Sequence, residues 1–233
     1  MAIYAISDLH LAFGIDKPMD VFGSRWANYM NRLEENWRST VGNNDYVLVP
    51  GDISWATYLD QAYKDFQFID RLPGKKIISK GNHDYWWTTK SKLDKYIVEN
   101  GFSTISFMHN NSYTFEGAAI CGTRGWKMPG DEGFNAEDEK IYQRELQRLE
   151  LSLKNAVVPE GGYLIAAMHF PIFNAKGVFS GFLDIMHKCD VQLCIYGHLH
   201  GEGHKNAVEG PIKGIEFRLV AADYLGFKPV RLI

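Results

Sequence analysis

The sequence predicts an α/β protein, because short apolar runs alternate with segments of helical spacing. Five of these runs are typical of short buried strands, and each is followed by polar residues: 3–6, 46–49, 76–79, 163–168 and 191–196. Proteins of this class gather their ligands in the loops at the carboxyl ends of the strands. We therefore expect the functional residues to lie together at one edge of the fold.

The spacing of apolar residues also predicts the remaining elements. Helical spacing indicates helices over 26–37 and 59–72, and the second of these ends at a Pro-Gly pair. The charged segment 135–157 carries leucines at helical spacing and predicts a long helix beside the site. Residues 113–122 and 215–222 predict two further strands.

Length and composition bound the class of protein. The chain has 233 residues, enough for one sizeable core, so we expect a single domain over 1–233. Its net charge of −3 provides no global positive field for nucleic acid or an anionic membrane. The first eight residues lack the basic start of a signal peptide, and no stretch is apolar enough to span a membrane. We expect a cytoplasmic protein with no membrane partner.

Two residue types need a separate interpretation. The cysteines are odd in number and have apolar surroundings, so we expect reduced thiols in the core at Cys121, Cys189 and Cys194. Five of the eight histidines fall in the polar clusters that follow apolar runs. The other three have no recognisable partners in the sequence and are expected at the surface: His109, His187 and His204.

The first clusters combine carboxylates with imidazoles and an amide. Asp8 and His10 are two residues apart, which would place both side chains on one face if the strand continued. Asp52 follows a glycine, which allows a close approach to a ligand. Asn82 and His83 also follow a glycine and precede an aspartate. Each pattern alone also fits an ordinary turn, but their joint occurrence at strand ends indicates a metal site.

Three more histidines complete the set. His169 follows an apolar run and, taken alone, also fits a buried core histidine. His198 and His200 lie in Gly-His-Leu-His. Imidazole nitrogens suit zinc, iron, cobalt and nickel, whereas carboxylates suit manganese and magnesium. Together the clusters offer more ligands than one ion needs, so we expect two ions in a site that attracts an anionic phosphate.

These clusters resemble the motifs of the calcineurin-like metallophosphoesterases, which run D-x-H, G-D, G-N-H-[D/E], H and G-H-x-H. All five occur here in that order, from Asp8 to His200. The resemblance implies an α/β fold with a two-sheet β-sandwich flanked by helices, in four layers ordered α-β-β-α. It implies one ion held by Asp8, His10, Asp52 and His200, and a second held by Asp52, Asn82, His169 and His198.

The resemblance also implies a mechanism. Two neighbouring divalent ions activate a water molecule as hydroxide and stabilise the phosphoryl oxygens during hydrolysis. His83 holds no ion in this scheme and would act as the general acid that protonates the leaving oxygen. Asp84 would brace the loop. We expect manganese to support activity best, with iron or zinc as alternatives that suit the same ligands.

Departures from subfamily patterns narrow the activity. Protein serine/threonine phosphatases of this family carry Gly-Asp-x-x-Asp-Arg-Gly where this chain has Gly-Asp-Ile-Ser-Trp-Ala-Thr from Gly51. The resemblance to that subfamily is therefore incomplete, and protein phosphatase activity is disfavoured. Purple acid phosphatases place a tyrosine where Trp55 stands, so an iron site with a tyrosinate ligand is also disfavoured.

Side chains beside the motifs have two interpretations each. Arg124 follows a predicted strand and is either a phosphate ligand or a partner in a surface ion pair. The aromatic residues beside the motifs, which could stack on an aromatic ester, are expected mainly to pack in the core: Trp55, Tyr85, Trp86 and Trp87.

The prediction is a two-metal hydrolase of a small phosphomonoester or phosphodiester. A nuclease or nucleotide phosphodiesterase is the alternative, but it would need a basic groove, and no run of lysine and arginine supplies one. A scaffold of the same fold without catalysis is a third hypothesis, which the intact Asn82 and His83 disfavour. The substrate depends on loops such as 12–22 and 127–134, whose shapes no motif determines.

Overall fold

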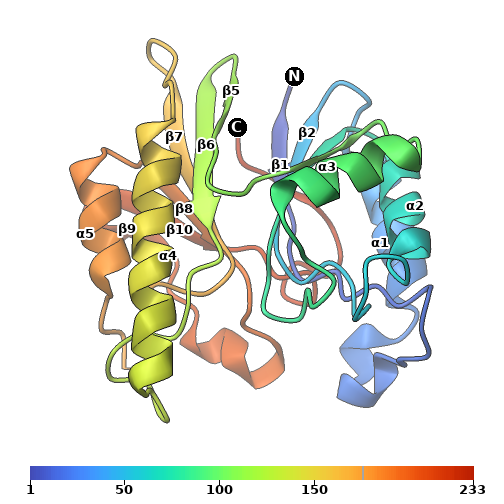
Figure 1. The fold of residues 1–233 in the computed structure, drawn as a ribbon, viewed down its shortest axis with the longest axis horizontal. Coiled ribbons are helices and arrows are strands. Elements are labelled where there is room, and N and C mark those ends of the chain that lie inside the picture. Colours follow the sequence, from blue (N-terminus) through green and yellow to red (C-terminus); the bar gives the residue numbers. More distant parts are fainter. Residues whose placement is uncertain (175) are drawn as a thin grey trace. The chain divides into compact units, whose positions relative to one another are not determined.

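The computed structural model describes residues 1–174 and 176–233. Contacts within the chain divide it into two compact units. The first unit comprises residues 1–107 and 220–233, and the second comprises residues 108–219. Each unit contains one multi-stranded sheet with its own helices (Figure 1).

The sheet of the first unit has five strands. Their order across the sheet is β11 (Val230–Arg231), β1 (Ile3–Ala5), β2 (Tyr46–Pro50), β3 (Lys75–Ser79) and β4 (Ile105–Phe107). Strands β1 to β4 are parallel, and β11 pairs with β1 antiparallel. The carboxyl ends of β1, β2 and β3 therefore meet at the same edge of this sheet.

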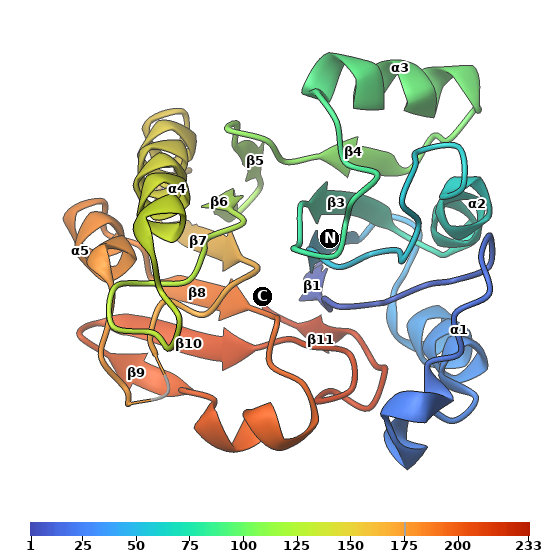
Figure 2. The ribbon, with the colours of Figure 1, turned by 60° about the horizontal axis from the view of Figure 1, so that its bottom comes forward.

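The helices of the first unit are amphipathic and pack on this sheet. They are α1 (Tyr29–Thr40), α2 (Tyr63–Arg71) and α3 (Lys90–Glu99), with short 3-10 helices at Asp20–Phe22 and Ser24–Trp26. One hydrophobic cluster joins Leu33 and Trp37 of α1, Phe66 of α2 and the strand residues Val47 and Val49. Figure 2 shows α1 and α2 on the same side of this sheet. The alternate residues of β2 that face these helices fix the register of the strand.

The sheet of the second unit has six strands. Their order is β5 (Tyr113–Phe115), β6 (Ala118–Thr123), β7 (Tyr163–Met168), β8 (Leu193–Tyr196), β10 (Ile215–Leu219) and β9 (Gly210–Ile212). The four central strands are parallel, whereas β5 and β9 are antiparallel edge strands. The carboxyl ends of β6, β7 and β8 therefore share one edge of this sheet.

Helices α4 (Ala136–Lys154) and α5 (Gly181–Lys188) belong to the second unit and lie beside each other on its sheet (Figure 2). A 3-10 helix at Gly201–Asn206 follows β8. A capping box starts α4: the Asn135 side chain accepts the backbone N–H of Asp138, and the Asp138 side chain accepts the backbone N–H of Asn135. This local signal explains why a charged segment begins a helix at a defined residue.

Most of the predicted elements are present. The structure confirms the α/β class with two sheets flanked by helices, the five apolar strands and the long helix predicted over 135–157. The strand predicted at 113–122 is a hairpin of β5 and β6, because the chain reverses at Gly117. That the two units form a single domain stays a prediction.

Two further findings concern the expectations from composition. Cys121 and Cys194 are buried thiols as predicted, but Cys189 is exposed, because it caps the end of α5 instead of lying in a strand. No helix in residues 1–174 and 176–233 is both long and apolar enough to cross a membrane.

Candidate metal centre

The predicted ligands of the first unit all follow neighbouring parallel strands. Asp8 and His10 come after β1, Asp52 comes after β2, and Asn82 and His83 come after β3. Because these three strands lie side by side, their polar ends share one edge of the sheet. The sheet therefore brings together residues that are more than 70 positions apart in the sequence.

The reason that the sequence suggested for the pairing of Asp8 with His10 is wrong. Strand β1 ends at Ala5, so strand geometry does not continue through the motif. Asp8 and His10 instead adopt left-handed backbone conformations, with φ of 59° and 47°. Asp52 does the same with φ of 53°. Such conformations cost free energy in residues other than glycine and persist where the surrounding structure and function require them.

Backbone hydrogen bonds hold the two strand-end segments against each other. The N–H of Asp8 donates to the carbonyl of Gly51 at 2.9 Å, and the N–H of His10 donates to the carbonyl of Asp52 at 3.0 Å. The side chains of Asp8, His10 and Asp52 are buried, with exposed fractions of 0%, 3% and 1%. Two carboxylates and an imidazole are thus removed from water at one place.

The distance between His10 and Asp52 fits two ligands of one ion. His10 Nε2 lies 3.8 Å from Asp52 Oδ2, which is too long for a hydrogen bond. Ligand atoms lie about 2.0–2.2 Å from a zinc-like ion, so two of them can be up to ~4 Å apart across it. The donor set and its spacing in the first unit therefore fit a divalent transition metal.

The segment after β3 is built around the Asp52 carboxylate. The backbone N–H of His83 donates to Asp52 Oδ1 at 2.8 Å. Gly81 passes so close that a Cβ added there would lie 2.0 Å from the same oxygen. Only glycine fits at this position, because any side chain would displace the carboxylate. The close approach of the backbone to the Asp52 carboxylate thus explains why Gly-Asn-His-Asp begins with a glycine.

Asp84 organises these loops from a fully buried position. Its carboxylate accepts the backbone N–H groups of Asp52 at 2.9 Å, Ile53 at 2.9 Å and Gly81 at 2.7 Å. It also accepts the indole N–H of Trp86 at 3.1 Å. These contacts support the bracing role predicted for Asp84.

The aromatic residues beside the motifs have different surroundings. Trp86 is buried in the core, as predicted, whereas Tyr85 is 63% exposed. Trp55 stacks on the His10 ring with centroids 4.7 Å apart and lies 4.4 Å from the His83 ring. Trp55 therefore positions two histidines of the candidate site in addition to packing against the core.

Sequence reasoning missed Lys17, whose ammonium lies 3.7 Å above the Trp55 ring. The residue lies in the segment 12–22 that we expected to shape specificity, but no motif marks it. Its position brings a cation near the rings of the candidate site in the first unit.

The predicted ligands of the second unit also follow parallel strands. His169 comes after β7 and is fully buried, and its N–H donates to the carbonyl of Arg124 at 3.1 Å. His198 follows β8 with a left-handed φ of 70°, and its ring lies 5.2 Å from the His169 ring. His200 is partly buried. The second unit therefore collects three imidazoles at one edge of its sheet.

One histidine that we expected at the surface lies beside His200. A ring nitrogen of His204 lies within 4.8 Å of one of His200. His204 is only partly exposed and lies in the 3-10 helix at Gly201–Asn206. Its spacing of four residues from His200 was a usable signal in the sequence.

Arg124 follows β6 and has a defined partner. Its Nη2 lies 3.6 Å from Oε1 of Glu145, which is fully buried in α4. The guanidinium also lies 4.3 Å above the ring of Trp126. Of the two interpretations of Arg124, these contacts favour the ion pair, although its partner is buried, and phosphate binding stays a prediction.

The two units thus offer carboxylate and imidazole groups of the kind that hold metal ions: Asp8, His10, Asp52, His169 and His200. Ions with mixed nitrogen and oxygen preference suit this set, because both donor types are present. The first unit contributes all the carboxylates of this set, and the second contributes imidazoles only.

Comparison with known proteins identifies the fold and the family. No protein of curated function matches the sequence. The structure is similar to that of AQ665, a protein of unknown function from Aquifex aeolicus, with 18% identity and a TM-score of 0.53 over 99% of this chain and 95% of that one. It is also similar to phosphopantetheinyl hydrolase (PptH) from Mycobacterium tuberculosis, with 13% identity and a TM-score of 0.57 over 100% and 95%.

At such identities these likenesses show the fold alone. The sequence profile of the calcineurin-like phosphoesterases matches residues 1–202, which include every predicted ligand. The chain belongs to the calcineurin-like phosphoesterase family.

Proposed function

We propose that this protein hydrolyses a small phosphomonoester or phosphodiester with the help of two divalent metal ions. The observation that carries the proposal is the buried group of Asp8, His10 and Asp52 in the first unit, where three left-handed residues converge at one sheet edge. Burying two carboxylates beside each other is costly, and a bound cation offsets that cost. Family membership supports hydrolysis as the reaction.

The ligands proposed for the two ions are those whose order matches the family motifs. They are Asp8, His10, Asp52 and Asn82 in the first unit, and His169, His198 and His200 in the second. When bound, the ions supply Lewis acidity to the phosphoryl oxygens and lower the pKa of a water that attacks phosphorus. We propose manganese as the ion that supports activity best.

His83 is proposed as the general acid. Hydrolysis breaks the bond between phosphorus and the leaving oxygen while a new bond forms to the oxygen of water. The leaving oxygen needs a proton, and a protonated imidazole at His83 can donate it. The hydrogen bond from the His83 backbone N–H to the Asp52 carboxylate and the contact with Trp55 hold the His83 ring in place. Such positioning is what a proton donor requires.

The name of phosphopantetheinyl hydrolase, a protein of similar fold, supports hydrolysis as the reaction class. Small esters are the proposed substrates because the chain has no net positive charge to attract a nucleic acid.

The test is hydrolysis of p-nitrophenyl phosphate and bis-p-nitrophenyl phosphate after chelation and readdition of Mn²⁺, Zn²⁺ or Fe²⁺. We expect turnover that depends on metal, and a fall of about 100-fold in kcat for His83→Ala with unchanged metal content. His187→Ala, which changes an exposed histidine on α5, is the matched control and should retain full activity. His198→Ala should lose bound metal.

Two results would contradict the proposal. Absence of turnover with every metal, in protein shown to bind two ions, would favour the scaffold hypothesis. Full activity in His83→Ala would remove the general acid from the mechanism. The ratio of diester to monoester turnover defines the substrate class in either case.

A further inference from the structure

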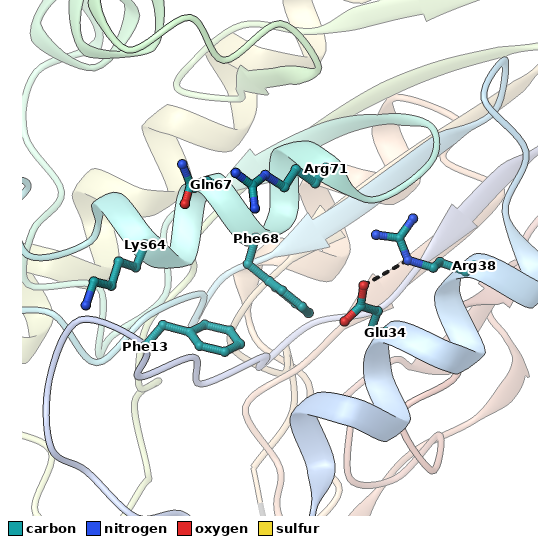
Figure 3. Close-up of a pocket in the computed structure, with 7 residues that line it drawn as sticks. All are labelled: Phe13, Glu34, Arg38, Lys64, Gln67, Phe68 and Arg71. Atoms are coloured by element: carbon teal, nitrogen blue, oxygen red, sulfur yellow. Dashed lines mark hydrogen bonds and ion pairs between the residues drawn. The ribbon is translucent and has the colours of Figure 1, made fainter.

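The first unit contains a cavity that none of the candidate metal ligands lines. It has a volume of about 510 Å³ and lies between α1, α2 and the segment that carries Phe13 (Figure 3). Pockets that hold small molecules typically measure ~300–1,000 Å³. The cavity is therefore large enough for a ligand of the size of a nucleotide.

Two aromatic rings form its apolar part. The rings of Phe13 and Phe68 lie 4.8 Å apart at an angle of 39°, and Figure 3 shows them next to each other. The backbone N–H of Phe13 donates to Oδ1 of Asp65 at 2.8 Å, and Asp65 is a fully buried residue in the first turn of α2. The Ser54 hydroxyl donates to the other oxygen of that carboxylate. The segment that carries Phe13 is thus fixed before any ligand binds.

Cations surround these rings. Lys64 and Arg71 lie two helical turns apart on the same face of α2 as Phe68. Arg38 of α1 also lines the cavity, but Glu34 neutralises its charge, because Arg38 Nε lies 2.9 Å from Glu34 Oε1. Within the part of the chain that the structure describes, Lys64 and Arg71 have no carboxylate at ion-pair distance. The lining thus has three cations and one carboxylate, a net charge of +2.

We propose that this cavity binds a small aromatic phosphate, with its planar ring on Phe13 and Phe68 and its phosphate between Lys64 and Arg71. Two uncompensated cations match a phosphate dianion better than a carboxylate with one charge. The guanidinium of Arg71 presents a fork of donors that fits phosphate oxygens. Aromatic faces contribute affinity for a flat ring without specifying its edge.

The test is calorimetric titration of the full chain with adenosine 5′-monophosphate after metal chelation, with adenosine and inorganic phosphate as comparisons. Chelation keeps this test separate from the proposed hydrolysis. We expect saturable binding of the nucleotide, weaker binding of each comparison compound, and a loss of at least about 10-fold in affinity for the double variant Lys64→Glu/Arg71→Glu. Lys92→Glu, which makes the same kind of charge change at an exposed site on α3, should bind like the wild type.

A second variant tests the aromatic part. Phe68→Leu keeps an apolar side chain but removes a ring face, so it should weaken binding of the nucleotide and leave binding of inorganic phosphate unchanged. The proposal is overturned if the wild type shows no saturation up to about 5 mM nucleotide. It is also overturned if the double variant binds as tightly as the wild type, because the nucleotide would then occupy another site.

Discussion

The carboxylate of Asp84 accepts the backbone N–H of Asp52 at 2.9 Å, and so ties the loop after β3 to the loop after β2. The same carboxylate accepts the N–H of Gly81 at 2.7 Å. One buried side chain therefore sets the distance between the loops that carry Asp52 and His83. Asp84 acts on the site through these backbones, as a positioning residue.

Asp84→Asn should lower both stability and activity. The amide nitrogen of asparagine cannot accept hydrogen bonds, so backbone N–H groups of the Asp52 and Gly81 loops lose their acceptor in a buried place. We expect the free energy of unfolding in urea to fall by about 2–4 kcal/mol. Asp94→Asn is the control, because Asp94 is 49% exposed and pairs with Lys90 on the surface. That change should cost under about 0.5 kcal/mol. Equal losses in the two variants would show that Asp84 has no special role.

Gly81→Ala should disrupt the site more locally. The new Cβ would lie 2.0 Å from Asp52 Oδ1 and 2.2 Å from the Asp52 nitrogen, so the carboxylate must move. We expect loss of at least one bound Mn²⁺ per chain, measured by elemental analysis after dialysis. Gly203→Ala is the control, because its nearest neighbour would be at an ordinary contact distance of 3.8 Å. Full metal content in Gly81→Ala would mean that Asp52 is not a ligand.

The sequence predicted the strands that carry the site because each is a continuous apolar run with a polar end. It missed β4, β9 and β11, which have only two or three residues and are recognisable only by their partners in the sheet. It also missed α3 and α5, since apolar residues are too few in α3 and the pattern in α5 is short. Local patterns predict elements whose burial is nearly complete, and tertiary pairing decides the others.

The identity of the candidate ligands could be predicted, but their local geometry could not. The spacing of Asp8 and His10 suggested a strand, whereas the chain adopts left-handed turns at both residues. Backbone strain of this kind is imposed by hydrogen bonds to another segment, here the carbonyls of Gly51 and Asp52. No pattern within residues 3–10 contains that information. The partners of Arg124 and Trp55 were unpredictable for the same reason.

The Asp65 carboxylate accepts hydrogen bonds from the segment that carries Phe13 and from Ser54, which lies two residues after Asp52. Titration of this carboxylate should make the stability of the protein depend on pH. Burial raises the pKa of the Asp65 carboxyl to about 6, although hydrogen bonds from Ser54 and Phe13 oppose this effect. In the unfolded chain the pKa is about 3.9. Between these two values the folded protein holds the proton that the unfolded chain has lost. The contribution of Asp65 to the free energy of unfolding therefore falls as pH rises through this window.

Asp65→Asn removes the titrating group but keeps an oxygen that can accept the N–H of Phe13. We expect the wild type to lose about 2–3 kcal/mol of unfolding free energy relative to the variant as the pH rises from 4 to 7. Urea unfolding at several pH values measures this difference. Comparing the two proteins cancels groups such as Asp45, whose pKa is lowered by the backbone N–H of Ala2 and which titrates in both. Parallel pH profiles for wild type and variant would show that the folded protein tolerates the ionised carboxylate, which requires that water or the Ser54 hydroxyl compensates its burial.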